Sequence, residues 1–439
     1  MAIKSALSFF IIFTLFCMLP YIQESVSIIY FTLFLVVLYL HFLGYKLGDP
    51  QVLILMGVIF FNARPFLDVV FDSETFGDTH GFFKSGSFDV EHIGGSIIYI
   101  KLSIMAFLIG MFRLDSNAEQ INNSIFLYHT KSYYKEFFVF LLIPTILACS
   151  SLIFLCTLNG GYAYFNSGST LVSILRRFIP LLTVCMTLNL IFYKEKFITY
   201  ILITICLSIS ILIGARLIGL MPIICLMVFC SFKHKDKYNK YFPIIALCLV
   251  MFTVLVNFFR AGNVIGTDVD YMFFVKFFLN EISFTSNLIP MAFEYTEVNG
   301  FTYGINYLGA IAATVPKLAF WMTVSDGTYS FSSALGMFYD PVAISKGLGL
   351  NGSMLGESYF SFGYFGLIVI FFISFSLRWL FNKTTSNIIW LYFILSASPY
   401  LLTMFIFEST IVTRGIVYYS LIPIFVFFVF IRKFSRVKK

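Results

Sequence analysis

Long apolar stretches, each about the length needed to cross a bilayer, recur along almost the whole chain. A helix needs about 20 apolar residues to cross a hydrocarbon core about 30 Å thick. Such stretches occur near 5–22, 27–43, 51–67, 93–112, 137–158, 171–193, 197–213, 217–232, 242–258, 360–381, 387–406 and 416–431. Arg64 and Pro65 interrupt the third stretch, so that helix is expected to be short, tilted or partly re-entrant. The pattern predicts an all-α polytopic membrane protein with about twelve transmembrane helices.

The composition agrees with a membrane environment. Of 439 residues, 59% are hydrophobic, 20% aromatic and only 12% charged, whereas soluble domains are about 45–50% apolar. The net charge of +7 comes from Lys and Arg residues dispersed among apolar stretches. They form no basic face of the kind that neutralises phosphate backbones, so no nucleic-acid partner is predicted. The eight cysteines lie in or beside apolar stretches and form no disulfide or zinc pattern.

The distribution of Lys and Arg predicts the orientation, because positively charged loops are retained in the cytoplasm. With both termini cytoplasmic, the cytoplasmic side carries a lysine-rich loop near 233–240 and the basic tail 432–439. The opposite side carries acidic loops. The predicted organisation is residues 1–258 with helices 1–9 and an outer loop near 68–92, a large outer loop at 259–358, and residues 359–439 with helices 10–12 and the tail.

The large outer loop is too rich in aromatic and aliphatic residues for disorder, so we expect it to fold. Residues 271–290 and 301–323 have helical apolar patterns, with aromatic side chains suited to the headgroup region. They are expected to form short amphipathic helices at the membrane surface. A Gly- and Ser-rich stretch at 325–356 then returns the chain to the bilayer.

Five arginines at or near the outer ends of predicted spans oppose the charge pattern. Arg216 lies in a short turn between the seventh and eighth spans, Arg260 follows the ninth, and Arg414 precedes the last. Arg176 and Arg177 lie about two turns inside the outer end of the sixth span. A guanidinium binds phosphate oxygens in a two-pronged manner and stays charged, which suits a lipid diphosphate. Alternatively, each side chain extends to the outer headgroups or pairs with a loop carboxylate.

A second cluster is the Gly- and Ser-rich stretch 349–366, which leads into the tenth span and contains Glu357. Its glycines permit close backbone approach. Glu357 lies at the apolar boundary and is the first candidate for a general base. The alternative is a helix-start carboxylate favoured by the helix dipole. The histidines form no metal-binding pair, and there is no P-loop, nucleophile elbow or dinucleotide fingerprint. No metal or cofactor is predicted.

In topology and motif order, the chain resembles the O-antigen polymerases, the bacterial oligosaccharide repeat-unit polymerases. The similarity covers about twelve spans, a large late outer loop and a series of short motifs: Gly214-Ala215-Arg216, Arg260, Glu357-x-Tyr359, Gly363-x-x-Gly366 and Arg414-Gly415. An Arg-x-ten-Gly pattern described for some members is absent at Arg260, because Tyr271 occupies the eleventh following position. No role is carried over from that pattern.

The resemblance implies a metal- and nucleotide-independent glycosyltransferase with a class C-like fold in the bacterial inner membrane, active at its periplasmic face. It implies transfer of the nascent glycan from undecaprenyl diphosphate onto the next lipid-linked repeat unit, with loss of the lipid diphosphate. Arg176, Arg177, Arg216, Arg260 and Arg414 would hold the diphosphates, and Glu357 would accept the proton of the attacking hydroxyl. The implied partners are the lipid-linked oligosaccharide, membrane lipids and a protein that regulates chain length.

Two other functions remain open on the sequence. A flippase or transporter for lipid-linked saccharide would also have about twelve spans and buried charges, but its loops should be shorter and its halves related. An O-antigen ligase would share the lipid-diphosphate chemistry and differ in its acceptor. The crowding of arginines at the outer ends of spans favours diphosphate chemistry over transport.

Overall fold

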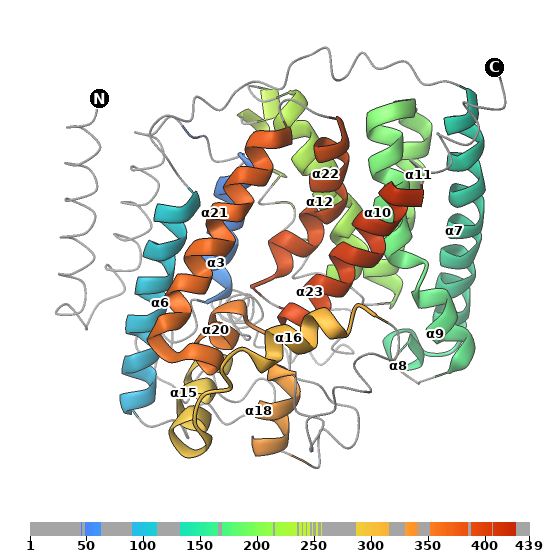
Figure 1. Cartoon of the computed structure of the whole chain (residues 1–439). Helices are drawn as coiled ribbons and strands as arrows, with labels where there is room; N and C mark the ends of the chain where they lie inside the picture. The colour runs from blue at the N-terminus through green and yellow to red at the C-terminus, as the bar shows by residue number, and fades with distance from the viewer. Residues whose placement is uncertain are drawn as a thin grey trace, which may run out of the picture. The chain divides into compact units, whose positions relative to one another are not determined.

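All regular secondary structure in the described part of the chain is helical. The structure is a computed structural model that describes residues 45, 49–62, 90–111, 132–165, 169–213, 216–234, parts of 237–256, 287–315, 330–339, 341, 352–384, 388–405 and 407–426. No β-strand occurs within these ranges. Figure 1 shows these helices as ribbons coloured by residue number. An all-helical chain satisfies its backbone hydrogen bonds within each element, as a membrane requires.

Six helices in the described ranges are long and apolar enough to cross a membrane: His92–Met111, Glu136–Leu158, Thr170–Tyr193, Lys196–Ile213, Met354–Thr384 and Ser409–Val426. They overlap predicted spans 93–112, 137–158, 171–193, 197–213, 360–381 and 416–431, and the last two helices begin before the predicted positions. Shorter apolar helices occupy much of predicted spans 51–67, 217–232 and 387–406. The predicted spans 5–22 and 27–43, and most of 242–258, lie outside the described residues. The helical membrane class is therefore confirmed, and the count of twelve stays a prediction.

The principal helices are α3 (Pro50–Phe61), α6 (Val90–Met111), α7 (Ser132–Leu158), α9 (Thr170–Arg176), α10 (Ile179–Leu188), α11 (Lys196–Ser208), α12 (Arg216–Lys233), α15 (Leu288–Asn299), α16 (Ile305–Ala312), α18 (Phe331–Tyr339), α20 (Met354–Phe362), α21 (Gly366–Thr384), α22 (Ile388–Thr403) and α23 (Ser409–Ile416). Four of these helices, α15, α16, α18 and α20, begin within the predicted outer loop. The expected amphipathic segment 301–323 contains α16, whereas most of 271–290 lies outside the described residues.

The chain divides into two compact units, and neither is a continuous segment. Unit 1 combines Met1–Glu119, Asp270–Trp379 and Leu402–Arg414. Unit 2 combines Gln120–Val269, Leu380–Leu401 and Gly415–Lys439. The predicted division into 1–258, 259–358 and 359–439 follows the order of spans and loops along the chain. It stays a prediction.

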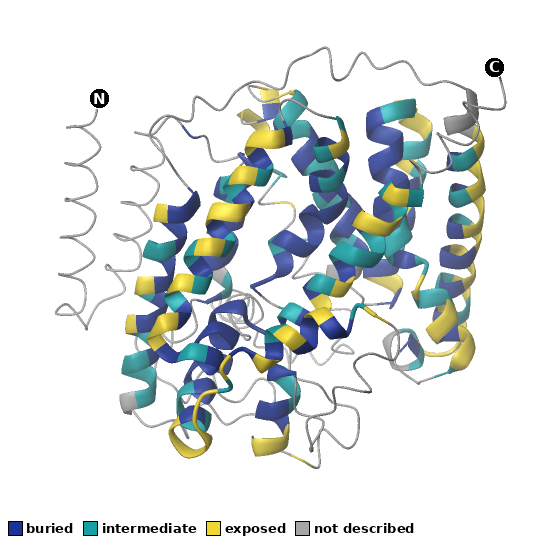
Figure 2. Ribbon diagram, in the orientation of Figure 1, coloured by how far each residue is buried: buried dark blue, intermediate teal, exposed yellow. Residues whose placement is uncertain are grey.

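In unit 1, α15 packs against α6, α18 and α20. Aromatic rings fill the contact: Phe293 of α15 stacks on Tyr359 of α20 with ring centroids 3.6 Å apart, and Tyr99 of α6 meets Tyr359 edge-on at 5.0 Å. Gly110 allows α6 to approach α21 closely, because a Cβ atom there would lie 1.9 Å from the Oγ of Ser374. These contacts fix α20 in the interior of the unit, where Figure 2 shows it almost entirely buried.

In unit 2, helices α7, α10, α11 and α12 pack against one another. Cys149, Cys185, Cys206 and Cys225 are buried among them and form no disulfide. The sequence prediction that these thiols act as small apolar side chains agrees with this placement.

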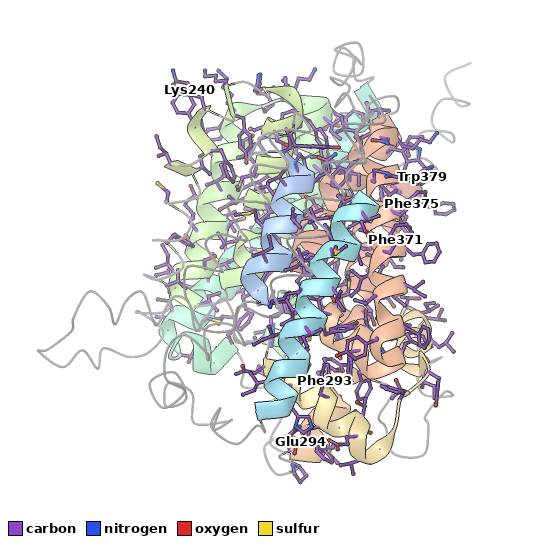
Figure 3. The ribbon with its side chains drawn as sticks, turned by 90° about the vertical axis from the view of Figure 1, so that its left-hand side faces the viewer. Lys240, Phe293, Glu294, Phe371, Phe375 and Trp379 are labelled. Atoms are coloured by element: carbon purple, nitrogen blue, oxygen red, sulfur yellow. The ribbon has the colours of Figure 1, made fainter. Side chains whose placement is uncertain are left out.

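Several helices display apolar side chains outward, as a lipid solvent permits. On α7, an exposed stripe of Phe140, Leu147 and Phe154 follows the helical repeat, and Figure 2 shows this stripe along the helix. On α21, Figure 3 shows Phe371, Phe375 and Trp379 in succession along one face. Such outward apolar stripes would be unfavourable in water, so they support a membrane environment.

Candidate functional site

The buried helix α20 begins at a close contact between two backbone segments of unit 1. Gly352 precedes the helix, and a Cβ atom there would lie 1.9 Å from the backbone nitrogen of Glu408. Ser353 caps the helix by accepting a hydrogen bond from the backbone N–H of Gly356, at 3.3 Å. Gly356 in turn leaves room for the ring of Phe331. The glycines of this stretch therefore permit close backbone approach, as the sequence predicted.

Glu357 is 1% exposed and accepts three hydrogen bonds within unit 1. Its Oε1 accepts from the hydroxyl of Ser409 at 2.6 Å and from the side-chain amide of Asn306 at 2.9 Å. Its Oε2 accepts from the backbone N–H of Ser409 at 2.8 Å. Ser409 is the first residue of α23, so the carboxylate lies where the helix dipole stabilises negative charge. Donors from α16 and α23 thus engage both oxygens of the buried carboxylate.

Asn306 is itself held in one orientation by neighbouring hydroxyl groups. Its Oδ1 accepts from Ser361 at 2.6 Å and from Thr302 at 3.2 Å, so its Nδ2 faces Glu357. One residue further on, the hydroxyl of Tyr307 lies 2.9 Å from the hydroxyl of Ser358. Burial raises the pKa of Tyr307 well above its ordinary value, and the nearby Glu357 carboxylate raises it further. The phenol therefore stays protonated and contributes to a buried polar network between α16 and α20.

A second carboxylate, Glu408, precedes Ser409 and is also buried. Its Oε2 accepts from the hydroxyls of Ser330 at 2.7 Å and Ser332 at 2.8 Å, and from the backbone N–H of Ser332 at 3.1 Å. These donors lie at the start of α18, so Glu408 satisfies the first turn of that helix. Two neighbouring carboxylates thus each bind the beginning of a different helix.

The sequence analysis missed Asn306, Glu408 and Ser409. A signal for Glu408 was present, because a carboxylate flanked by apolar segments between the last two spans is a costly residue that needs partners. Asn306 and Ser409 gave no comparable signal. Their importance arises from contacts with Glu357, at sequence separations of 51 and 52 residues.

Arg414 lies on α23, five positions after Ser409, and its side chain is exposed. Its Nε–H donates to the carbonyl oxygen of Ala313, at the end of α16, at 3.1 Å. No carboxylate pairs with the guanidinium within the described part of the chain, and Arg414 lies in unit 1. The contact fixes the inner part of the guanidinium, and its terminal nitrogens keep their donors for another acceptor.

The other predicted arginines belong to unit 2. Arg176 donates from Nη1 to the carbonyl oxygen of Phe165 at 3.2 Å, and its guanidinium lies 4.2 Å from the centroid of that ring. Arg177 is exposed at the end of α9. Arg216 begins α12, but its side chain lies outside the described residues, as does all of Arg260. That these arginines and Arg414 form one site stays a prediction.

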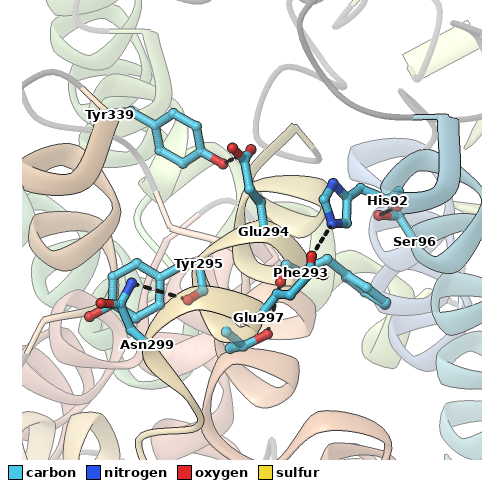
Figure 4. A network of polar contacts seen from close by, with 9 residues as sticks. His92, Ser96, Phe293, Glu294, Tyr295, Glu297, Asn299 and Tyr339 are labelled. Atoms are coloured by element: carbon cyan, nitrogen blue, oxygen red, sulfur yellow. Dashed lines mark hydrogen bonds and ion pairs between the residues drawn. The ribbon is translucent and has the colours of Figure 1, made fainter.

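Further polar contacts in unit 1 join α15 to its neighbours. Figure 4 shows the hydroxyl of Tyr339, at the end of α18, directed at the carboxylate of Glu294, to which it donates a hydrogen bond. His92 of α6 pairs with the exposed Glu297 at 2.8 Å. Figure 3 shows Phe293 and Glu294 near each other and apart from Phe371, Phe375 and Trp379 of α21. Across the described ranges, no group of three or more His, Cys, Asp or Glu residues is arranged to hold a metal ion.

These features define a polytopic membrane protein, helical in its described ranges, with a buried carboxylate network beside an exposed arginine. A family model described as O-antigen polysaccharide polymerase Wzy matches residues 4–439, and the chain belongs to this family. The resemblance inferred from the sequence is therefore confirmed. No curated protein and no solved structure matches the chain. Membership in this family supports a glycosyltransferase-like polymerase that joins lipid-linked O-antigen repeat units.

Proposed function

We propose that the protein polymerises undecaprenyl-diphosphate-linked oligosaccharide at the periplasmic face of the bacterial inner membrane. A hydroxyl oxygen on the non-reducing sugar of a new lipid-linked repeat attacks the anomeric carbon of the nascent glycan. The bond from that carbon to the phosphate oxygen breaks, a glycosidic bond forms, and the lipid diphosphate leaves. The hydroxyl proton passes to a base or to the departing phosphate. The donor is already activated, so the step needs neither nucleotide nor metal.

The observation that best supports this chemistry is the placement of Arg414. Its guanidinium is anchored at Nε and exposed beyond it, so the remaining donors are oriented before a ligand arrives. A diphosphate is the ligand class that such a fork suits. The same bond to Ala313 would form if Arg414 served only to stabilise the carboxyl end of α16. Substitutions must therefore distinguish diphosphate binding from helix stabilisation. In the proposal, Arg176, Arg177, Arg216 and Arg260 also bind lipid diphosphate.

Glu357 is the carboxylate of the proposed site. To act as the general base, it would have to be reached by a sugar hydroxyl, although it is buried and already accepts three hydrogen bonds. The engagement of both carboxylate oxygens instead favours a role in positioning Arg414.

The proposal includes about twelve spans of a class C-like glycosyltransferase fold, with both termini in the cytoplasm. The segment 259–358 is placed on the periplasmic side. A protein that regulates chain length is the expected macromolecular partner.

The function is tested by deleting the gene in its native host and separating the extracted surface glycan on a gel. The proposal predicts that deletion leaves core carrying a single repeat unit in place of a ladder, and that the wild-type chain restores the ladder. Free polymer without attachment to core would show a ligase. Repeat units retained on lipid at the cytoplasmic face would show a flippase.

In the same host, we expect Arg414→Ala to abolish the ladder while the protein remains in the membrane. Arg414→Lys should also fail, because an ammonium cannot reproduce two-pronged binding. Arg378→Ala, in the part of the chain assigned to the cytoplasmic side, is the control and should keep the ladder. Full function of the lysine variant would contradict two-pronged binding. Full function of both variants would exclude Arg414 from the site.

A further inference from the structure

Two polar connections tie α16 to α23 in unit 1. At the start of both helices, the Glu357 carboxylate accepts from Asn306 and from Ser409. At their ends, the Arg414 side chain donates to the carbonyl oxygen of Ala313. The pairing of start with start and end with end means that the helices run in the same direction. Figure 1 shows α16 (orange) beside the beginning of α23 (red).

The connection through Glu357 determines where α23 begins. Ser409 contributes both its backbone N–H and its hydroxyl, so the carboxylate fixes the position and the rotation of the first turn. Arg414 follows five residues later, just over one helical turn away. A change at Glu357 or Asn306 would therefore rotate or shift the guanidinium without any direct contact to it.

We propose that Asn306 and Glu357 are positioning residues, which hold α23 so that the Arg414 guanidinium meets the lipid diphosphate. This inference rests on the proposed polymerase function. It assigns to Asn306, which the sequence did not mark, a part in catalysis. It also gives Glu357 a different role: in place of proton transfer, Glu357 orients Arg414, the group that stabilises the leaving diphosphate.

The polar network makes a swap of side chains possible. In the double variant Asn306→Asp, Glu357→Gln, the new amide nitrogen at position 357 takes the place of Oε1. It can donate to the new carboxylate at position 306, while its second N–H faces the hydroxyl of Ser409. The remaining amide oxygen still accepts from the backbone N–H of Ser409, and the carboxylate at position 306 still accepts from Ser361 and Thr302. Each contact of the network is kept, with the Ser409 hydroxyl accepting where it donated before, and one negative charge remains. Residue 357 can no longer take up a proton as a carboxylate.

The experiment uses the full chain in proteoliposomes, with lipid-linked repeat units extracted from the deletion strain as substrate. The initial rate of polymer formation is measured against substrate concentration to give kcat and KM, and thermal melting reports folding. Asn306→Asp alone places two carboxylates in contact, and we expect kcat to fall roughly tenfold or more. Adding Glu357→Gln should bring kcat back to within about threefold of wild type.

Combination with Arg414→Ala separates positioning from a general structural role. Arg414→Ala is expected to lose the ladder in cells, so this comparison uses the slow initial rate that it retains in proteoliposomes. If Asn306 acts through Arg414, Asn306→Asp should lower that rate by less than about twofold. A further loss comparable to that in the wild-type background would contradict the proposal. So would a double swap that melts like wild type but remains inactive, because this would require a carboxylate at position 357.

Ser409→Ala keeps the proposal testable if the swapped protein fails to fold. It removes the hydroxyl bond to Oε1 and leaves the backbone bond. We expect a loss of roughly three- to tenfold in kcat, since hydrogen bonds to a charged group are among the stronger ones. An unchanged kcat in the folded variant would overturn the positioning role. Absence of polymerisation by the wild-type protein would instead refute the proposed function itself.

Discussion

Gly352→Ala is the substitution with the most direct structural consequence at this site. A Cβ atom at position 352 would lie 1.9 Å from the backbone nitrogen of Glu408 and 2.4 Å from its Cα. Ordinary contact begins near 3.4 Å, so the two backbones must separate by about 1.5 Å. Neither side of this contact is a flexible side chain that could move aside. The segment that carries Glu408 and Ser409 must therefore shift.

The expected loss follows from the bonds on that segment. Ser409 lies one residue beyond the clash and gives Glu357 two hydrogen bonds, of 2.6 and 2.8 Å. A shift of this size would break both, and each hydrogen bond to a charged group contributes about 1.5–3 kcal/mol. Overpacking costs about 1–3 kcal/mol more where the backbone does not relax. We expect a destabilisation on the order of 3 kcal/mol or more, seen as a drop of several degrees in Tm.

Thermal melting of the purified full chain in detergent measures this loss, and the glycan ladder in the deletion host measures activity. Gly94→Ala is the matched control, because a Cβ atom at Gly94 has no neighbour within 4 Å and alanine favours a helix by about 0.5–1 kcal/mol. Gly352→Ala should lose the ladder, and Gly94→Ala should keep it. A Gly352→Ala protein with wild-type Tm and a full ladder would refute the reasoning about this contact.

Substitutions at two other contacts in unit 1 should change stability by different amounts. Gly110→Ala would place its Cβ atom 1.9 Å from the Oγ of Ser374 and 2.7 Å from the carbonyl oxygen of Phe371, so Tm should fall by several degrees; an unchanged Tm would contradict tight packing of α6 on α21. His92→Ala removes a pair with the exposed Glu297 and should change the unfolding free energy by less than about 1 kcal/mol. A larger loss in a denaturant titration would show that this pair is coupled to other contacts.

The apolar periodicity alone determined the class of the protein. Stretches of about 20 apolar residues fix the position of a helix because the bilayer leaves the backbone no other hydrogen-bond partner. Predicted spans such as 137–158 and 197–213 therefore agree closely with the observed helices Glu136–Leu158 and Lys196–Ile213. The glycines near Glu357 were also informative, because glycine marks places where backbones approach closely. The resemblance to the O-antigen polymerases also rested on the apolar stretches and on short motifs that contain glycine and arginine.

The partners of Glu357 were decided by the tertiary structure. Asn306 and Ser409 lie about 50 residues away in opposite directions along the chain, and they meet only because α16 and the start of α23 pack beside α20. Hydropathy contains no information about that pairing, since an amide and a hydroxyl are unremarkable until a buried charge needs them. The sequence could mark Glu357 and Arg414 as costly charges near a membrane, but only the fold connects the carboxylate to the helix that carries the arginine. The physical reason is that a buried charge is stabilised by groups close in space, whatever their separation in sequence.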